Sequence, residues 1–151
     1  MELRSKFMAT MRIIVSETHF LEDTPYGWKR IDVFGGGSFE GPAIKATILS
    51  GGSDALLRRN DEAMQPDVRL TLKTDDSAII FVTYRGLRHG PPEVMARIAR
   101  DENVGPDEYY LRNTIYFETG SKRYGWLNRC IAVGVGHREP SAVVYQVHEI
   151  L

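Results

Sequence analysis

One predicted strand carries a row of side chains that could act on a small organic molecule. Within residues 111–118, strict alternation places Arg112, Thr114, Tyr116 and Glu118 on one face, about 6–7 Å apart. A carboxylate such as that of Glu118 can move a proton, while a guanidinium and a phenol can hold a carboxylate or an enolate oxygen. This chemistry requires the face to line an enclosed interior; the alternative is a water-facing strand that needs no functional explanation.

Two neighbouring groups extend this candidate site. Trp126 and Asn128, on the next predicted strand, would lie opposite the row and add an aromatic wall and an amide. Arg85, Arg88 and His89 follow a strongly apolar strand and could receive an anionic substrate group or stabilise a developing enolate. The alternative for Arg88 and His89 is a surface turn in which the arginine pairs with an acidic neighbour.

Several other chemistries are not supported by the sequence. The glycine run at residues 35–37 lacks the Gly-Lys-Ser/Thr ending of a phosphate-binding loop and leads into Pro42, so we interpret it as a turn. The four histidines show no metal-ligand spacing, and Cys130 lies among apolar residues as a packing thiol. We therefore expect no metal and no cofactor.

The hydrophobic pattern predicts mainly strands. Residues 68–73 alternate apolar and polar, residues 78–85 are apolar on both faces, and the turn residues 75–77 between them predict a hairpin. Five further strands are expected at residues 12–20, 44–49, 111–118, 125–135 and 142–150. One short helix is expected over residues 92–101, because prolines open it and Val94 and Ile98 form an i,i+4 apolar pair.

This pattern predicts a single antiparallel β-barrel domain over residues 11–151, with residues 1–10 as a flexible tail. The chain has 151 residues, 42% of them hydrophobic, which suffices for one core. A formal net charge of −1 argues against a nucleic-acid partner. No apolar stretch is long enough for a membrane span or a signal peptide, and a single cysteine is typical of a reducing compartment, so we expect a cytoplasmic protein.

Several segments resemble the family catalogued as domain of unknown function 3237. The resemblance runs from about Met11 to the C-terminus, and its motifs lie at residues 36–42, 51–54, 86–91, 109–112, 117–120 and 124–129. It implies a small barrel like those of allene oxide cyclases and calycins, but it assigns no activity. The motif positions it carries over are Glu40, Asp54, Arg112, Glu118, Trp126 and Asn128. Ala55 and Ser77 depart from the family pattern, at positions where an aromatic residue and a glycine are expected.

These observations lead to three functional hypotheses. The first is a cofactor-independent isomerase, cyclase or lyase that acts on an aromatic or keto acid inside the barrel. In it Glu118 moves the proton, and Arg112, Arg85 and Tyr116 hold the anion. Trp126 stacks on the organic part, and the remaining ligand-binding residues are Arg88, Asn128, Glu40 and Asp54. The second is a non-catalytic carrier or sensor that uses the same cavity. The third is a homo-oligomer that assembles through uncovered strand edges and apolar outer faces.

Overall fold

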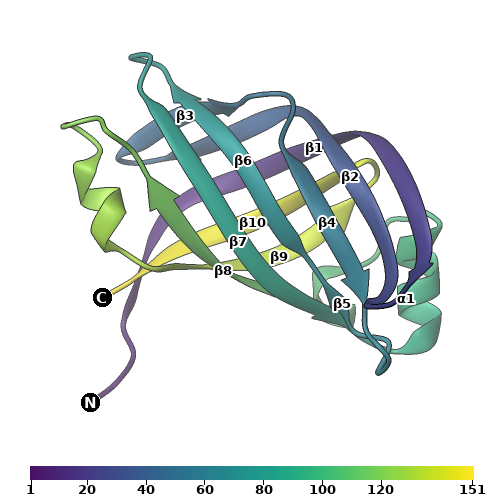
Figure 1. The fold of residues 1–151 in the computed structure, drawn as a ribbon. Helices are drawn as coiled ribbons and strands as arrows, with labels where there is room; N and C mark the ends of the chain where they lie inside the picture. Colours follow the sequence, from purple (N-terminus) through teal and green to yellow (C-terminus); the bar gives the residue numbers. More distant parts are fainter.

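The computed structural model describes residues 1–151 as one sheet of ten antiparallel strands with one α-helix, α1, at one end (Figure 1). The strands are β1 (Ser5–Thr24), β2 (Gly27–Gly41), β3 (Ile44–Ile48), β4 (Ser53–Arg58), β5 (Met64–Gln65), β6 (Asp67–Thr74), β7 (Ile79–His89), β8 (Tyr110–Glu118), β9 (Ala132–Glu139) and β10 (Ala142–Ile150). The helices are α1 (Pro92–Ala99) and the short 3₁₀ segments η1 (Pro106–Glu108) and η2 (Gly125–Arg129).

The sheet closes on itself through β1. This 20-residue strand pairs with β10 along its first half and with β2 along most of its length, so the first and last strands of the chain are neighbours. Shifts in register after Ile14, Val15 and Phe20 bend β1 around the barrel. The predicted fold class, a single antiparallel barrel with one short helix, is confirmed.

The barrel end opposite α1 is filled by apolar side chains. On β6 the residues Val68, Leu70 and Leu72 point inward and are buried, as the period-two pattern predicts. Phe39 and Phe117 meet edge to face there with ring centroids 6.0 Å apart. The 3₁₀ segment η2 closes this end, and the hydroxyl of Tyr124, the residue before it, donates to Asp76. This half of the barrel is a packed apolar core.

Three local predictions are wrong. β1 begins at Ser5 and its Met8 is buried, so most of the expected tail at residues 1–10 belongs to the barrel. The glycines at residues 35–37 lie inside β2 instead of forming a turn, and Gly37 lies so close to Arg12 of β1 that a Cβ would meet its carbonyl oxygen. The strand expected at residues 125–135 is divided into η2 and β9.

No helix in the structure has the length and apolar character needed to cross a membrane.

Two phenylalanines test which face of the sheet is the core. Phe39 is fully buried, whereas Phe81 lies on the outer face of β7 and is 40% exposed. We expect Phe39→Ala to lower the free energy of unfolding by about 3–5 kcal/mol, as for other buried aromatic truncations. Phe81→Ala should cost less than half as much, because its ring already contacts water. Urea denaturation measures both, and equal losses would contradict this assignment of faces.

Candidate functional site

The row of side chains on β8 lies on the outside of the barrel. Leu111, Asn113, Ile115 and Phe117 are the buried members of this strand, so the alternate residues point to solvent. Tyr116 is 52% exposed, and Glu118 is exposed as well. Arg112 turns back over the Tyr110 ring, 4.9 Å from its centroid, on this outer surface. The expectation that Arg112, Tyr116 and Glu118 face an enclosed interior is therefore wrong.

Four other predicted site residues also lie outside the barrel interior. Arg85 is on the outer face of β7 and forms an ion pair with Asp67, 3.3 Å away. Glu40 is exposed on β2. Trp126 and Asn128 belong to η2 at the filled end, where the Asn128 side chain hydrogen-bonds the backbone of Thr119 at 2.8 and 2.9 Å. Asn128 therefore pins a loop, and it lies far along the barrel from the charged interior.

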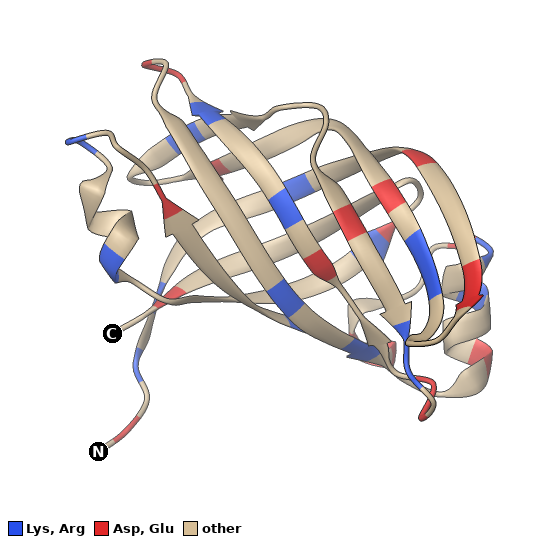
Figure 2. Ribbon diagram, viewed as in Figure 1, with Lys and Arg blue, Asp and Glu red and all other residues tan.

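The interior at the α1 end instead holds five charged side chains. They come from four strands: Arg30 and Asp32 from β2, Asp54 from β4, Arg88 from β7 and Arg138 from β9. The alternation that buries Ile80, Val82 and Tyr84 of β7 carries Arg88 inward as well. Of the predicted site residues, only Arg88 and Asp54 lie in this group. Figure 2 shows acidic and basic positions interleaved on the strands at this end.

Four of these side chains line a small cavity, the inner chamber. Its volume is about 20 Å³, enough for roughly one water molecule. The chamber is lined by Asp32, Asp54, Arg88, Arg138 and the phenols Tyr84 and Tyr145, together with six apolar residues. The rings of Tyr84 and Tyr145 pack edge to face, 5.4 Å apart, and separate the chamber from the apolar core.

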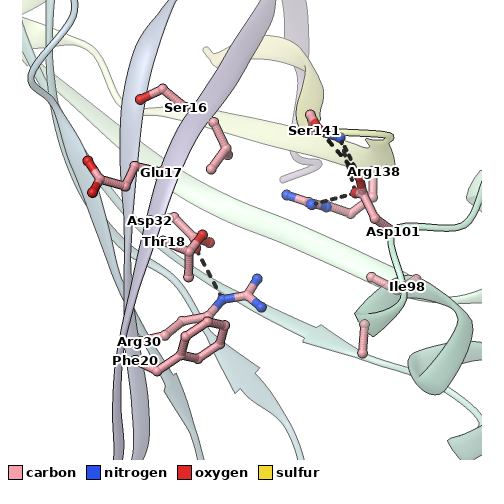
Figure 3. A pocket seen from close by; sticks show the side chains of 12 residues that line it. Ser16, Glu17, Thr18, Phe20, Arg30, Asp32, Ile98, Asp101, Arg138 and Ser141 are labelled. Atoms are coloured by element: carbon pink, nitrogen blue, oxygen red, sulfur yellow. Dashed lines mark hydrogen bonds and ion pairs between the residues drawn. The ribbon is translucent and has the colours of Figure 1, made fainter.

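Two larger surface pockets border the chamber. The Trp28 pocket, about 540 Å³, is lined by Trp28, Met64, Arg88 and the α1 residue Met95 among others. The Asp101 pocket, about 300 Å³, lies between β1, β2, α1 and the β9–β10 turn (Figure 3). Arg88 lines both the chamber and the Trp28 pocket, and Asp32 and Arg138 line both the chamber and the Asp101 pocket. The three cavities therefore adjoin one another through these shared residues, and together they make the candidate site.

Two of the three interior arginines have a carboxylate partner. Arg30 Nε lies 3.2 Å from Asp32 Oδ1, and the same oxygen accepts a hydrogen bond of 2.8 Å from the Thr18 hydroxyl. Arg138 forms an ion pair of 3.4 Å with Asp101. In Figure 3 the guanidinium groups of Arg30 and Arg138 project into the Asp101 pocket from opposite walls.

Arg88 differs from both because it forms no ion pair and no side-chain hydrogen bond. It is only 8% exposed, and its Nε has no hydrogen-bond partner, as is also true of the Nε of Arg30 and Arg138. Burial lowers the pKa of Arg88 to about 10, and repulsion from Arg138 and Arg30 contributes to the shift. The side chain still carries its charge at neutral pH. A buried cation with an unused donor is costly unless an acceptor reaches it.

Asp54 supplies a titratable group to the same chamber. Burial in the barrel, helped by the neighbouring Asp32, raises its pKa to about 7. A hydrogen bond of 2.9 Å from the Asp67 N–H to Oδ1, and the charges of Arg88 and Arg30, act in the opposite direction. The residue keeps partial accessibility through the cavity, and its Oδ2 has no hydrogen-bond partner in the protein. At neutral pH this carboxyl group can accept or release a proton.

The two tyrosines remain protonated under the same conditions. Burial raises the pKa of both Tyr84 and Tyr145 above the usual value for a phenol. Neither hydroxyl can serve as a base near neutral pH, but each can donate a hydrogen bond. No group of three or more His, Cys, Asp or Glu side chains is arranged to hold a metal ion. The chemistry available at the site is thus anion binding, hydrogen-bond donation and proton transfer.

The fold and the site define a small antiparallel β-barrel whose interior is apolar at one end and charged at the other. The chain belongs to the family described as "Protein of unknown function (DUF3237)", whose model matches residues 3–150. It is 31% identical over 149 residues to the UPF0311 protein RPA1785 of Rhodopseudomonas palustris, covering 99% of this chain and 97% of that protein. The predicted family membership is confirmed.

Solved structures share the whole fold. The crystal structure of RPA1785, a protein described as of unknown function, superposes with a TM-score of 0.96 over 100% of this chain and 99% of the other. A "beta-barrel like protein" of Acinetobacter baumannii AYE gives 0.87 at 32% identity, covering 100% and 98% of the two chains. An enzyme from Penicillium herquei gives 0.74 at 20% identity, over 100% and 96%, and this match shows the fold alone.

Sequence reasoning missed most of the charged interior. Arg30 and Asp32 lie between Trp28 and Phe34 on the inner face of β2, a strand that the hydrophobic pattern did not reveal. The signal was present as charged residues at i and i+2 between aromatic residues of the same face. Tyr84 was assigned to the correct strand but was not considered as part of a site. Arg138 had no comparable signal, because its inward direction depends on where β9 begins.

Asp54 should make folding stability depend on pH. Its folded pKa of about 7 lies above the value of 3.8 expected for an exposed aspartate, so the folded state binds the proton more tightly than the unfolded chain. Protonated Asp54 therefore stabilises the fold at low pH. This contribution to the free energy of unfolding is lost as the pH rises from about 4 to 7, and Asp54 causes no further change above pH 7. Between pH 5 and 8 this loss is at most about 2–3 kcal/mol.

The measurement is urea denaturation at both pH values. Asp54→Asn should remove this part of the pH dependence, while Glu118→Gln, which changes an exposed outer carboxylate, should leave it intact. An unchanged pH profile in Asp54→Asn would show that Asp54 titrates in the normal range of an exposed carboxyl group.

Proposed function

We propose that the protein binds a small organic acid at the α1 end of the barrel and moves a proton of that ligand with Asp54. The observation that carries the proposal is Arg88, a buried guanidinium that forms no ion pair or side-chain hydrogen bond and lines both the inner chamber and the Trp28 pocket. A carboxylate or enolate of the ligand supplies the missing acceptor. The reaction class that fits is a cofactor-independent isomerase, cyclase or lyase.

The Trp28 pocket fits the organic part of such a ligand. Trp28, Phe20, Met64, Met95 and Ile98 supply an apolar wall, and Arg88 is among the charged residues of the pocket. Met side chains adapt to ligand shape, and Trp28 offers a ring face for stacking. Arg58 already lies over this ring, 5.1 Å from its centroid, at the rim. The pocket thus combines a broad apolar surface with a cation, as an aromatic or keto acid requires.

The groups around the inner chamber suit proton transfer next to a carbonyl. Removing a proton from the carbon beside a carboxylate or ketone places negative charge on the carbonyl oxygen. Arg88, with donors from Tyr84 or Tyr145, would stabilise that oxygen, and Asp54 would take the proton and return it at another position. No metal or cofactor enters this scheme. Catalysis on the same barrel architecture has a precedent in the structure described as an enzyme from Penicillium herquei.

A second candidate function is a non-catalytic carrier or sensor. The size of the inner chamber favours it, because a volume of about 20 Å³ next to Asp54 admits a water molecule or one ligand oxygen but not a reacting carbon. A carrier needs only Arg88 and the Trp28 pocket. Catalysis needs the ligand to come closer to Asp54, which requires the chamber to widen.

Anion recognition by Arg88 can be tested with a matched pair of probes. 2-Naphthoate and 2-naphthamide have almost the same shape, but only the first is charged. We expect naphthoate to bind more tightly, and Arg88→Gln to weaken naphthoate about 10–100-fold, the range for losing a hydrogen bond to a charged group. Arg85→Gln, which removes an arginine from the outer face of the same strand, should have no effect. Calorimetric titration measures the affinities; equal binding of naphthoate to Arg88→Gln would refute the assignment.

Solvent deuterium exchange distinguishes the enzyme from the carrier. Keto acids that carry a hydrogen on the carbon beside the carbonyl, incubated with the protein in D₂O, should incorporate deuterium at that carbon faster than without protein. Exchange should rise with pH through about 7, as the Asp54 carboxylate forms, and it should be lost in Asp54→Asn. Proton NMR measures it. Ligands that bind but are recovered without deuterium would favour the carrier.

A further inference from the structure

The helix α1 separates the two surface openings of the site. Its last residues, Ile98 and Ala99, line both the Trp28 pocket and the Asp101 pocket. The helix lies across the end of the barrel where the charged interior is found (Figure 1). Displacing α1 would merge the two pockets into one opening above the inner chamber.

The helix α1 is held by a small apolar contact and a few polar ones. Val94 and Ile98 are buried against the core and Met95 packs beside it, while Arg97 pairs with Glu108 of η1 at 3.0 Å. The helix N-terminus has no side-chain cap.

The residue two positions after the helix, Asp101, makes the polar connection to the barrel. Its carboxylate accepts hydrogen bonds of 3.0 and 3.1 Å from the backbone N–H of Ser141, in the β9–β10 turn, and lies 3.4 Å from Arg138 (Figure 3).

The backbone at this connection is strained on both sides. Asp101 and Ser141 have φ angles of 59° and 55°, in the left-handed region that residues with a Cβ seldom occupy. Such conformations persist when surrounding contacts hold them, and they often mark segments that move. Here the hydrogen bonds between Asp101 and Ser141 hold both conformations. Loss of these bonds would allow both residues to return to ordinary φ angles.

Arg138 connects this contact to the ligand site. The same guanidinium lines the inner chamber and the Asp101 pocket. Its ion pair with Asp101 is long, at 3.4 Å, and part of the pair is exposed. An anionic ligand in the chamber would compete with Asp101 for this guanidinium.

We propose that α1 is a lid over the charged interior, latched by the contact of Asp101 with Ser141 and Arg138, and that the ligand enters when this latch opens. The idea rests on the proposed function in one respect: it takes the covered chamber to be the ligand site. Opening of the lid would supply the room beside Asp54 that the closed chamber lacks.

Quenching of Trp28 fluorescence tests the lid without any ligand. Trp28 lines the pocket wall that faces α1, and the other tryptophan, Trp126, lies at the filled end and can be removed as Trp126→Phe. In this background, Asp101→Ala should raise the acrylamide quenching constant of Trp28 at least twofold. Asp101→Asn should give a smaller rise, because its amide oxygen can still accept from Ser141. Asp107→Ala is the matched control, since Asp107 is an exposed acid near α1 with no such contact, and it should change nothing.

Hydrogen exchange by mass spectrometry shows whether the change is local. The lid account predicts faster exchange over residues 92–101 in Asp101→Ala, with unchanged exchange in β6 and β7. Unchanged quenching of Trp28 in both Asp101 variants, or faster exchange throughout the barrel, would overturn it. Failure of naphthoate to bind would refute the proposed function but leave these lid measurements unaffected.

Discussion

The inner surface of the barrel changes from apolar to charged at the layer formed by Tyr84 and Tyr145, and the position of the site depends on this change. On the core side of the layer, the side chains of Leu70, Ile80 and Val82 fill the interior. On the other side, closure of the sheet brings charged residues from four strands together away from bulk water. Close packing of the apolar half holds the strands in register. This rigid support keeps the chamber at the charged half open.

Burial then gives these charges their unusual properties. Arg30 and Arg138 share the cost of burial with carboxylates, whereas Arg88 does not. The same environment raises the pKa of Asp54 to about 7, so the interior carries more positive charge at the acidic side of neutrality than its composition suggests. Binding an anion would give the Arg88 guanidinium a partner and would reduce the excess positive charge of the interior. Burial of Arg88 and Asp54 in the same chamber thus accounts for both the proposed anion binding and the proposed proton transfer.

Much of the fold could be predicted from the sequence, because period-two patterns are a local property. The hairpin of β6 and β7, the strands β3, β8 and β10 and the start of α1 follow from alternation and turn residues. The glycines of β2 were misinterpreted, since the close approach of another strand at Gly37 is a long-range feature that local turn preferences do not report. The division of residues 125–135 into η2 and β9 likewise depends on Leu127 packing into the end of the barrel.

The candidate site was harder to predict than the fold. Alternation on β8 was recognised correctly, but it cannot state which face is inner, and the polar face proved to be the outer one. On β7 the pattern was less obvious at Arg88, a charged residue that continues an apolar inner face. Arg88 and Asp54 were named for other reasons, and their meeting in one chamber required the register of the closed sheet.

The central claim is that the barrel interior holds an anion site at Arg88, and anomalous diffraction from crystals soaked in sodium bromide tests it directly. The account predicts a bromide peak inside the barrel within contact distance of the Arg88 guanidinium. Bromide peaks at outer arginines such as Arg85 and Arg129, with none in the interior, would contradict it.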